Sequence, residues 1–166
     1  MLAVPAGDKL PLLCDYMREK VDVEFSPATS QGFAVLNDAG NFVGAVLVSN
    51  ITFSHGKPVN CEISCASDSI VAWRPSVCKA VFQYVFGQLG CVRCTSITKK
   101  NNTRARAFLE ALNFQLEGRI RKGYDGDKDA LIYGLLAEDC QFFEGSLNGQ
   151  EIIASSASGT GPRSYG

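Results

Sequence analysis

The chain has 166 residues, 46% of them apolar, and its 16 Lys and Arg against 17 Asp and Glu give a formal net charge of -1. This length and composition predict a single globular domain. The near-zero charge excludes a general attraction to nucleic acid or anionic membranes, while leaving room for a local basic patch. We find no apolar run near the ~20 residues that a bilayer span needs, and no charged start ahead of a long apolar core, so we expect a cytoplasmic protein.

The first half of the chain predicts one helix followed by strands. Apolar residues at helical spacing predict a helix over residues 9–21, with Asp8 as its cap. Turn formers at residues 37–41 join two apolar runs and predict an antiparallel hairpin. The predicted strands of this half cover residues 32–36, 42–49, 51–53 and 59–66, with a His-Gly-Lys-Pro turn before the last of them.

The second half predicts two helices between further strands. Pro75 is favoured at a first helical position, and the helix that it starts ends at Leu89, before Gly90. Asn102 or Thr103 caps a short amphipathic helix, which Asn113 ends. The predicted strands cover residues 92–98, 115–121 and 131–137, with a loop over residues 122–130.

These elements together predict the fold class. Strand, helix and strand between residues 59 and 98 imply a parallel crossover, whereas the flanking hairpins are antiparallel. We therefore expect an α/β (α+β) fold with a mixed, mostly antiparallel sheet, a central parallel β-α-β crossover and helices on both faces. We expect residues 1–144 to form this domain. Residues 145–166 are rich in Gly and Ser and predict a flexible tail, which a partner surface would have to order.

The seven cysteines are scattered through apolar segments and lack the spacing of a disulfide framework. This is typical of buried thiols in a reducing compartment. Cys91 and Cys94 form a C-x-x-C, but three residues apart on a strand they point to opposite faces. We therefore predict that they pack in the core, and we expect no metal site.

One stretch resembles a known family. Residues 102–121 read N-x-x-A-x-x-F-L-E-x-L-N-F-x-x-E-G-x-x-R, which resembles the C-terminal half of the GCN5-related N-acetyltransferase (GNAT) superfamily, especially its branch acetylating protein N-termini and polyamines. Small acetyltransferase-like proteins of bacteriophages are similar as well, in W-R-x-x-V from Trp73 and Y-x-F-x-Q-L-G from Tyr84. The resemblance covers residues 8–143.

The resemblance implies a site for acetyl-CoA as co-substrate, where the two central parallel strands splay apart. Its pantetheine arm would contact Ile63, Ser64, Cys65 and Asn102, and its pyrophosphate the helix start at Arg74, Ser76, Val77 and Cys78. The glycines of the family's phosphate loop are absent here, and Pro75 has no amide. Arg74 and Ser76 would replace amides by side-chain contacts. An ordinary central strand and a capped helix start are the alternatives.

Amine acetylation also needs a base and an acid. By resemblance Glu62 is the base; the alternative is a solvent-facing carboxylate. His55 is the sole histidine, and its turn predicts an exposed side chain. The family's acid positions correspond to Leu109 and Ala105, neither of which carries a proton to donate. Tyr124 and Tyr133 are weaker sources of a hydroxyl.

The sequence also contains two charged stretches that could bind a ligand. A basic cluster would receive the 3′-phosphate of the co-substrate, a nucleic-acid backbone or an acidic protein, or would form a solvated helix face; its members are Lys99, Lys100, Arg104, Arg106, Arg119, Arg121 and Lys122. Residues 125–129 begin like a calcium loop. Ala130 and Leu136 break that pattern at its sixth and twelfth positions, which favours a solvated turn.

Two functions remain open at this point. The first is a GNAT-type N-acetyltransferase that moves acetyl from acetyl-CoA to a primary amine, expected on a protein, with Glu62 as base and Arg104 on a phosphate. The second is a catalytically degenerate GNAT-fold phage protein in the host cytoplasm or the virion, bound to assembly proteins through its tail. We expect no membrane or nucleic-acid partner and leave a homo-oligomer open.

Overall fold

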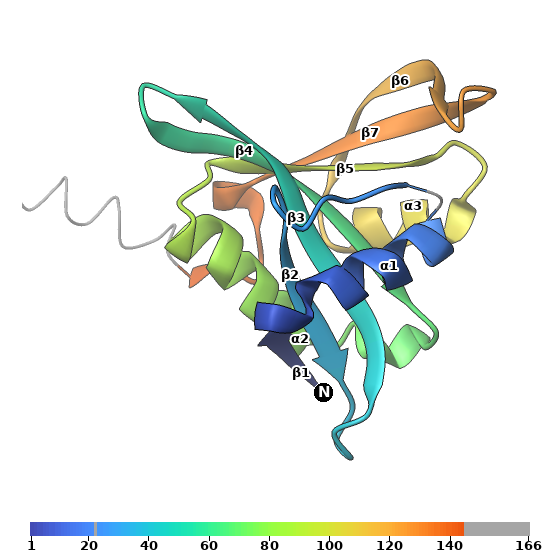
Figure 1. Cartoon of the computed structure of the whole chain (residues 1–166). Coiled ribbons are helices and arrows are strands. Elements are labelled where there is room, and N and C mark those ends of the chain that lie inside the picture. The colour runs from blue at the N-terminus through green and yellow to red at the C-terminus, as the bar shows by residue number, and fades with distance from the viewer. Residues whose placement is uncertain (22, 145–166) are drawn as a thin grey trace, which may run out of the picture.

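A computed structural model describes residues 1–21 and 23–144, so the predicted tail lies outside the described residues. Its strands form one sheet in the order β1-β2-β3-β4-β5-β7-β6 (Figure 1). The strands are β1 (Leu2–Pro5), β2 (Gln31–Leu36), β3 (Phe42–Ser54), β4 (Lys57–Ser67), β5 (Arg93–Lys99), β6 (Gln115–Tyr124) and β7 (Lys128–Leu136), and the helices are α1 (Leu10–Val21), α2 (Pro75–Phe82) and α3 (Thr103–Ala111). Only β4 and β5 pair in parallel, which confirms the predicted mixed sheet.

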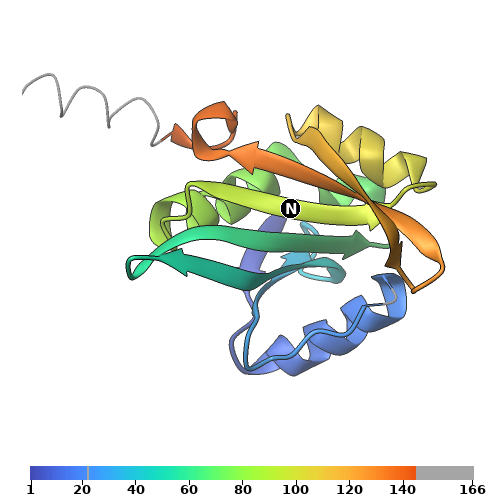
Figure 2. The same cartoon turned by 90° about the horizontal axis from the view of Figure 1, so that it is seen from above.

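Helices cover both faces of this sheet because side chains alternate along its strands. Val46 and Val48 of β3 belong to a core cluster shared with α2 and α3. Ala45 and Leu47, which point the other way, pack with Met17 and its neighbours on α1. Figure 2 shows α1 on one side of the sheet and α3 on the other.

The N-terminal region differs from the prediction in two ways. β1 was not predicted, because four residues are too short to show a period; it pairs with β2. The cap assigned to Asp8 is wrong, since Asp8 lies inside the 3-10 turn Gly7–Lys9. Ala6 precedes that turn, and its carbonyl accepts from the Lys9 amide at 3.0 Å, so the chain is already turning before Asp8 is reached.

The predicted helix over residues 75–89 divides in two. α2 ends at Phe82, and the turn Gln83–Gln88 is a π-helix, closed by the Leu89 amide, which donates to the Tyr84 carbonyl at 2.7 Å. Such a widened turn has no period that the sequence displays. Gly90 still ends the segment, with a φ of +79°.

The last hairpin is longer than predicted, and the short helix is as predicted. β6 runs to Tyr124 and β7 begins at Lys128, so the expected loop is a tight turn; an exposed edge strand has too few apolar residues to show its length. In α3 the Asn102 side chain accepts from the Ala105 amide at 3.0 Å, and Asn113 has a φ of +71°. The predicted cap and stop are both confirmed.

Two further observations concern the whole described chain. Cys91 and Cys94 are 2% and 0% exposed in the core, as predicted. Within residues 1–21 and 23–144, no helix combines the length and apolar character required to cross a membrane.

Candidate functional site

The two parallel strands stay together for only three residues. Asn60–Glu62 of β4 pair with Arg93–Thr95 of β5, and beyond this point β4 continues beside β3 and β5 beside β7 (Figure 1). A cavity of about 330 Å³ opens where they part. It is lined by β4 and β5 together with the end of α1, α3 and the β6–β7 turn, through Lys20, Val21, Val23, Glu62, Ser64, Cys65, Ser96, Ile97, Thr98, Lys99, Asn102, Ala105, Phe108, Leu109, Gly123, Tyr124 and Asp125.

A second cavity of about 640 Å³ continues from the first. Both are lined by Cys65, Asn102 and Ala105, among others, and the second adds Trp73 and Arg104. Together they form one groove from the splayed strands to Trp73, which precedes α2. We refer to the two cavities as the groove.

The structure brings half of the predicted site residues into this groove. Glu62, Ser64, Cys65 and Asn102 line the first cavity, and Arg104 lines the second. The side chain of Ile63 points to the opposite face of β4 and is 7% exposed in the core, so only its backbone faces the gap between the strands. All these roles remain predictions.

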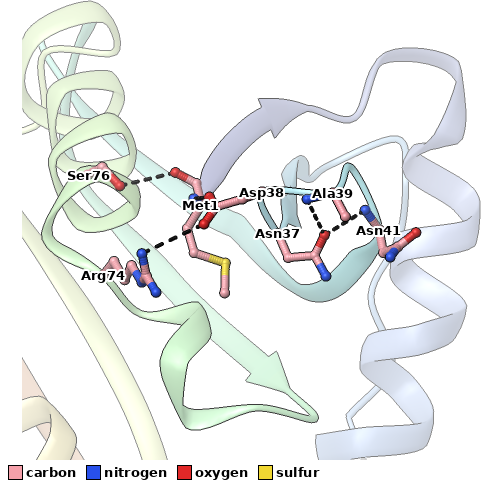
Figure 3. Close-up of polar contacts among 7 residues, drawn as sticks. All are labelled: Met1, Asn37, Asp38, Ala39, Asn41, Arg74 and Ser76. Atoms are coloured by element: carbon pink, nitrogen blue, oxygen red, sulfur yellow. Dashed lines mark hydrogen bonds and ion pairs between the residues drawn. The ribbon is translucent and has the colours of Figure 1, made fainter.

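The predicted pyrophosphate residues at the start of α2, unlike Arg104, lie outside the groove and have other partners. Arg74 Nη1 is 3.9 Å from Asp38 Oδ2, and Ser76 Oγ donates to the Met1 carbonyl at 3.1 Å (Figure 3). The Met1 ammonium completes this cluster by donating to Asp38, and that hydrogen bond lowers the pKa of the Asp38 carboxyl. The start of α2 thus faces the chain's own N-terminal residue and the β2–β3 turn.

Two backbone amides of this helix start are also engaged. Val77 and Cys78 donate to the carbonyl of Arg74 at 2.9 and 3.2 Å, and both side chains are buried. Phosphate binding by Arg74, Ser76, Val77 and Cys78 therefore stays a prediction that requires these contacts to open. Beyond the missing glycines, the sequence shows no sign of this cluster.

The carboxylates of the groove differ in their surroundings. Glu62 Oε2 accepts a hydrogen bond from Asn50 Nδ2 at 2.9 Å. Asp125 is 3.2 Å from Lys99 and 3.4 Å from Lys128, so cations neutralise it. Lys20 is 2.5 Å from Asp68 and lowers the pKa of that carboxyl by a hydrogen bond. Among the described lining residues, Glu62 is the carboxylate that forms no ion pair and is thus the better candidate for a base.

Cys65 provides the groove with a thiol but not with a nucleophile. It is half-buried, whereas the other six cysteines are buried. Burial raises the pKa of the Cys65 thiol to about 12, so it stays protonated at neutral pH. Only a thiolate attacks efficiently.

The candidates for a proton-donating hydroxyl differ in whether they reach the groove. Leu109 and Ala105 line the first cavity, as the family positions would, but carry no acidic proton. Tyr124 lines it too, and its hydroxyl donates to the Val21 carbonyl at 2.5 Å. Tyr133 lines neither cavity; it is 0% exposed and donates to Glu110 Oε1 at 3.1 Å.

Ser96 and Thr98 also line the first cavity but were not predicted as site residues, although they follow the residues of β5 that pair with β4. The sequence indicates them only by hydroxyl side chains at alternate positions of β5, a pattern that any sheet surface can have.

The remaining candidates lie elsewhere or have partners. His55 is exposed in the β3–β4 turn, as predicted. Two members of the basic cluster form ion pairs with the last hairpin: Arg119 of β6 pairs with Asp129 of β7, and Lys99 of β5 pairs with Asp125 in the β6–β7 turn. Over residues 1–21 and 23–144, no three His, Cys, Asp or Glu side chains gather as a metal site.

Comparison with solved structures gives similar folds. A spermidine N-acetyltransferase SpeG chimera from Vibrio cholerae and hSSAT has a TM-score of 0.64 and 17% identity, over 81% of this chain and 95% of that chain. A GCN5-related N-acetyltransferase from Brucella melitensis has a TM-score of 0.58 and 21% identity, over 81% and 73%. Mycobacterium smegmatis RimJ in complex with CoA-disulfide has a TM-score of 0.58 and 20% identity, over 89% and 69%.

No family model matches the sequence, and no curated protein matches it either. At these low identities, the structural likeness shows that the chain has the GNAT fold. It does not by itself carry an activity from one protein to another.

Proposed function

We propose that this protein is a GNAT-type N-acetyltransferase, which transfers the acetyl group of acetyl-CoA to a primary amine on a protein. The observation that carries the proposal is the groove at the splayed strands. Beyond Glu62, β4 pairs with β3 on one side and has no ladder to β5 on the other. Backbone groups of Ile63, Ser64 and Cys65 on that side can pair with the amides of a pantetheine arm, as an added strand would.

The groove is suited to the rest of such a donor. Asn102 caps α3 through its Oδ1, which leaves its amide nitrogen for the pantetheine carbonyls. Arg104 lies farther along, beside Trp73, where a guanidinium suits phosphate oxygens. These contacts give the co-substrate a path from β4 to α3 that does not depend on Arg74 or Ser76.

The reaction would then be a direct transfer. Glu62 takes one proton from the ammonium of the acceptor, and the amine nitrogen forms a bond to the acetyl carbon while the carbon–sulfur bond breaks. The thiolate that leaves takes up one proton; we assign it to the phenol of Tyr124, which lines the first cavity and would have to release the Val21 carbonyl to donate it. A protonated Cys65 argues against an acetyl-cysteine intermediate.

The charge of the groove favours an acceptor with a single ammonium. Its described lining carries three cations, Lys20, Lys99 and Arg104, against two carboxylates, Glu62 and Asp125. A polyamine would need a surplus of carboxylates to offset its several charges. A protein amine fits this balance better.

Binding can be tested with the only tryptophan of the chain, since Trp73 lines the second cavity. Titration of acetyl-CoA should change Trp73 fluorescence with saturation, and calorimetry should give the same Kd. Trp73→Phe should abolish the optical signal. An absence of heat at millimolar acetyl-CoA would remove the proposal.

Turnover can be tested with peptides that carry a free N-terminus or a lysine. Glu62→Gln should lower kcat by roughly 10²-fold, the lower range for loss of a general base. Its affinity for acetyl-CoA should be retained, because the base acts on the acceptor. His55→Gln is a matched control outside the groove and should keep wild-type turnover.

A second function, a non-catalytic scaffold, is favoured by one observation. Arg74 and Ser76 contact Asp38 and Met1, and the amides of Val77 and Cys78 bond to the Arg74 carbonyl. A phosphate therefore has no ready site at this helix start. We propose that role, in a virion or another assembly, only if acetyl-CoA fails to bind in the tests above.

A further inference from the structure

Asn50 lies at an irregularity of β3 next to the predicted base. Ser49 pairs with Glu62, and the next registered pair is Thr52 with Asn60. Two residues of β3, Asn50 and Ile51, thus stand opposite the single residue Cys61. This is a β-bulge, which inserts one residue into a strand and redirects side chains.

The backbone of Asn50 carries the conformation that such a bulge needs. Its φ is +49°, in the left-handed region that non-glycine residues seldom adopt and that Asn tolerates best. Uncommon backbone conformations persist where the surrounding structure holds them and often accompany functional sites. Asn50 is exposed, so burial of its side chain does not explain the conformation.

The bulge changes the direction in which Asn50 points. Ser49 and Glu62 are direct cross-strand partners, so their side chains lie on the same face of the sheet. In a regular strand the next residue would point to the opposite face. Instead, Asn50 Nδ2 donates to Glu62 Oε2 at 2.9 Å, while Ile51 packs against the core shared with α2 and α3.

We propose that Asn50 is a positioning residue, which holds the Glu62 carboxylate toward the groove; the catalytic part of this inference rests on the proposed function. An amide donor on Oε2 fixes the carboxylate plane and leaves Oε1 to receive the proton of the acceptor ammonium. Asn50 lines neither cavity, so it acts through Glu62 and not on a ligand.

Two variants at this position separate backbone from side chain. Asn50→Gly accepts a positive φ more readily and removes the amide. Asn50→Asp keeps the shape and the tolerance for positive φ but replaces the donor by a carboxylate that repels Glu62. Asn113→Gly is the matched control, because Asn113 also has a positive φ and lies outside the groove.

Steady-state kinetics give the first readout. We expect Asn50→Gly to lower kcat about 10-fold, by analogy with the lower range for loss of a hydrogen-bond partner that orients a metal ligand. Asn50→Asp should lower kcat further than Asn50→Gly does. The KM for acetyl-CoA should not change in either variant, and the kcat of Asn113→Gly should match that of the wild type. Wild-type kcat in Asn50→Gly, with the fold intact by circular dichroism, would overturn the proposal.

A second readout does not depend on activity. The side-chain amide protons of Asn50, followed by NMR, should shift on Glu62→Gln substitution, while those of Asn113 should not. An unchanged Asn50 signal would overturn the proposed contact. If the wild type has no turnover, the proposed function fails, and this NMR result alone decides whether Asn50 holds Glu62.

Discussion

Replacing Tyr133 by Phe separates a structural hydroxyl from a catalytic one. Tyr133 lies on β7 beside β5, is 0% exposed, and donates to Glu110 Oε1 at 3.1 Å while accepting from Arg106 Nε at 3.4 Å. Because it lines neither cavity of the groove, we expect Tyr133→Phe to keep wild-type kcat.

The expected loss of stability in Tyr133→Phe follows from the surroundings of the hydroxyl. Glu110 is exposed and Arg106 half-buried, so water can solvate both after the change. The larger cost of leaving a buried charge unpaired therefore does not apply. The free energy of unfolding should fall by about 1 kcal/mol, which is a typical net value for a hydrogen bond. In a domain of this size, that lowers Tm by about 2–4 °C.

Tyr133→Ala provides the scale for this measurement. Removing the whole ring from a fully buried position leaves a cavity and should cost about 3–5 kcal/mol, by analogy with Phe. Thermal and urea unfolding measure both variants, and peptide turnover measures Tyr133→Phe. A tenfold or larger fall in kcat at unchanged stability would refute the reasoning, because the hydroxyl would then serve the chemistry.

Two further changes test the fold around the groove. The pKa of Asp38 is lowered in the folded state. The ionised carboxylate therefore stabilises the fold at pH values above the ordinary pKa of 3.8, and this stabilisation disappears as the pH falls through the lowered pKa. Asp38→Asn should therefore be less stable than wild type in urea at neutral pH and equal to it in strong acid; a pH-independent difference would contradict this. Gly44→Ala should cost about 1–3 kcal/mol, because its Cβ would lie 2.8 Å from the Ala66 carbonyl oxygen. Gly118→Ala, with its nearest atom at an ordinary 3.4 Å, should unfold near the wild-type Tm, and equal losses in both would contradict the clash.

Several features of the fold follow from short stretches of sequence. Asn102 caps α3 and Asn113 ends it because each acts on backbone groups within three residues of itself. Pro75 starts α2 for a similar reason, since its fixed φ suits a first helical position. Local signals of this kind also gave the order of strands and helices, and with it the mixed sheet.

Elements with weak or interrupted periods were harder to predict. β1 is too short to show alternation, and the exposed edge strand β6 carries few buried residues that would mark its length. The π turn after Phe82 breaks the helical period that predicted one continuous helix. In each case, pairing or packing with a distant element decides the structure.

The amino-acid sequence alone determined the scaffold and the positions of Glu62 and Asn102 on it. Tertiary structure alone decided which groups meet there. Asn50 reaches Glu62 across 12 residues, Ser76 reaches Met1 across 75, and Tyr124 reaches Val21 across 103. Such contacts arise from register, bulges and the packing of separate elements, which no local pattern encodes. The cap of α3 could therefore be predicted, whereas the surroundings of the candidate base and of the helix start at Pro75 could not.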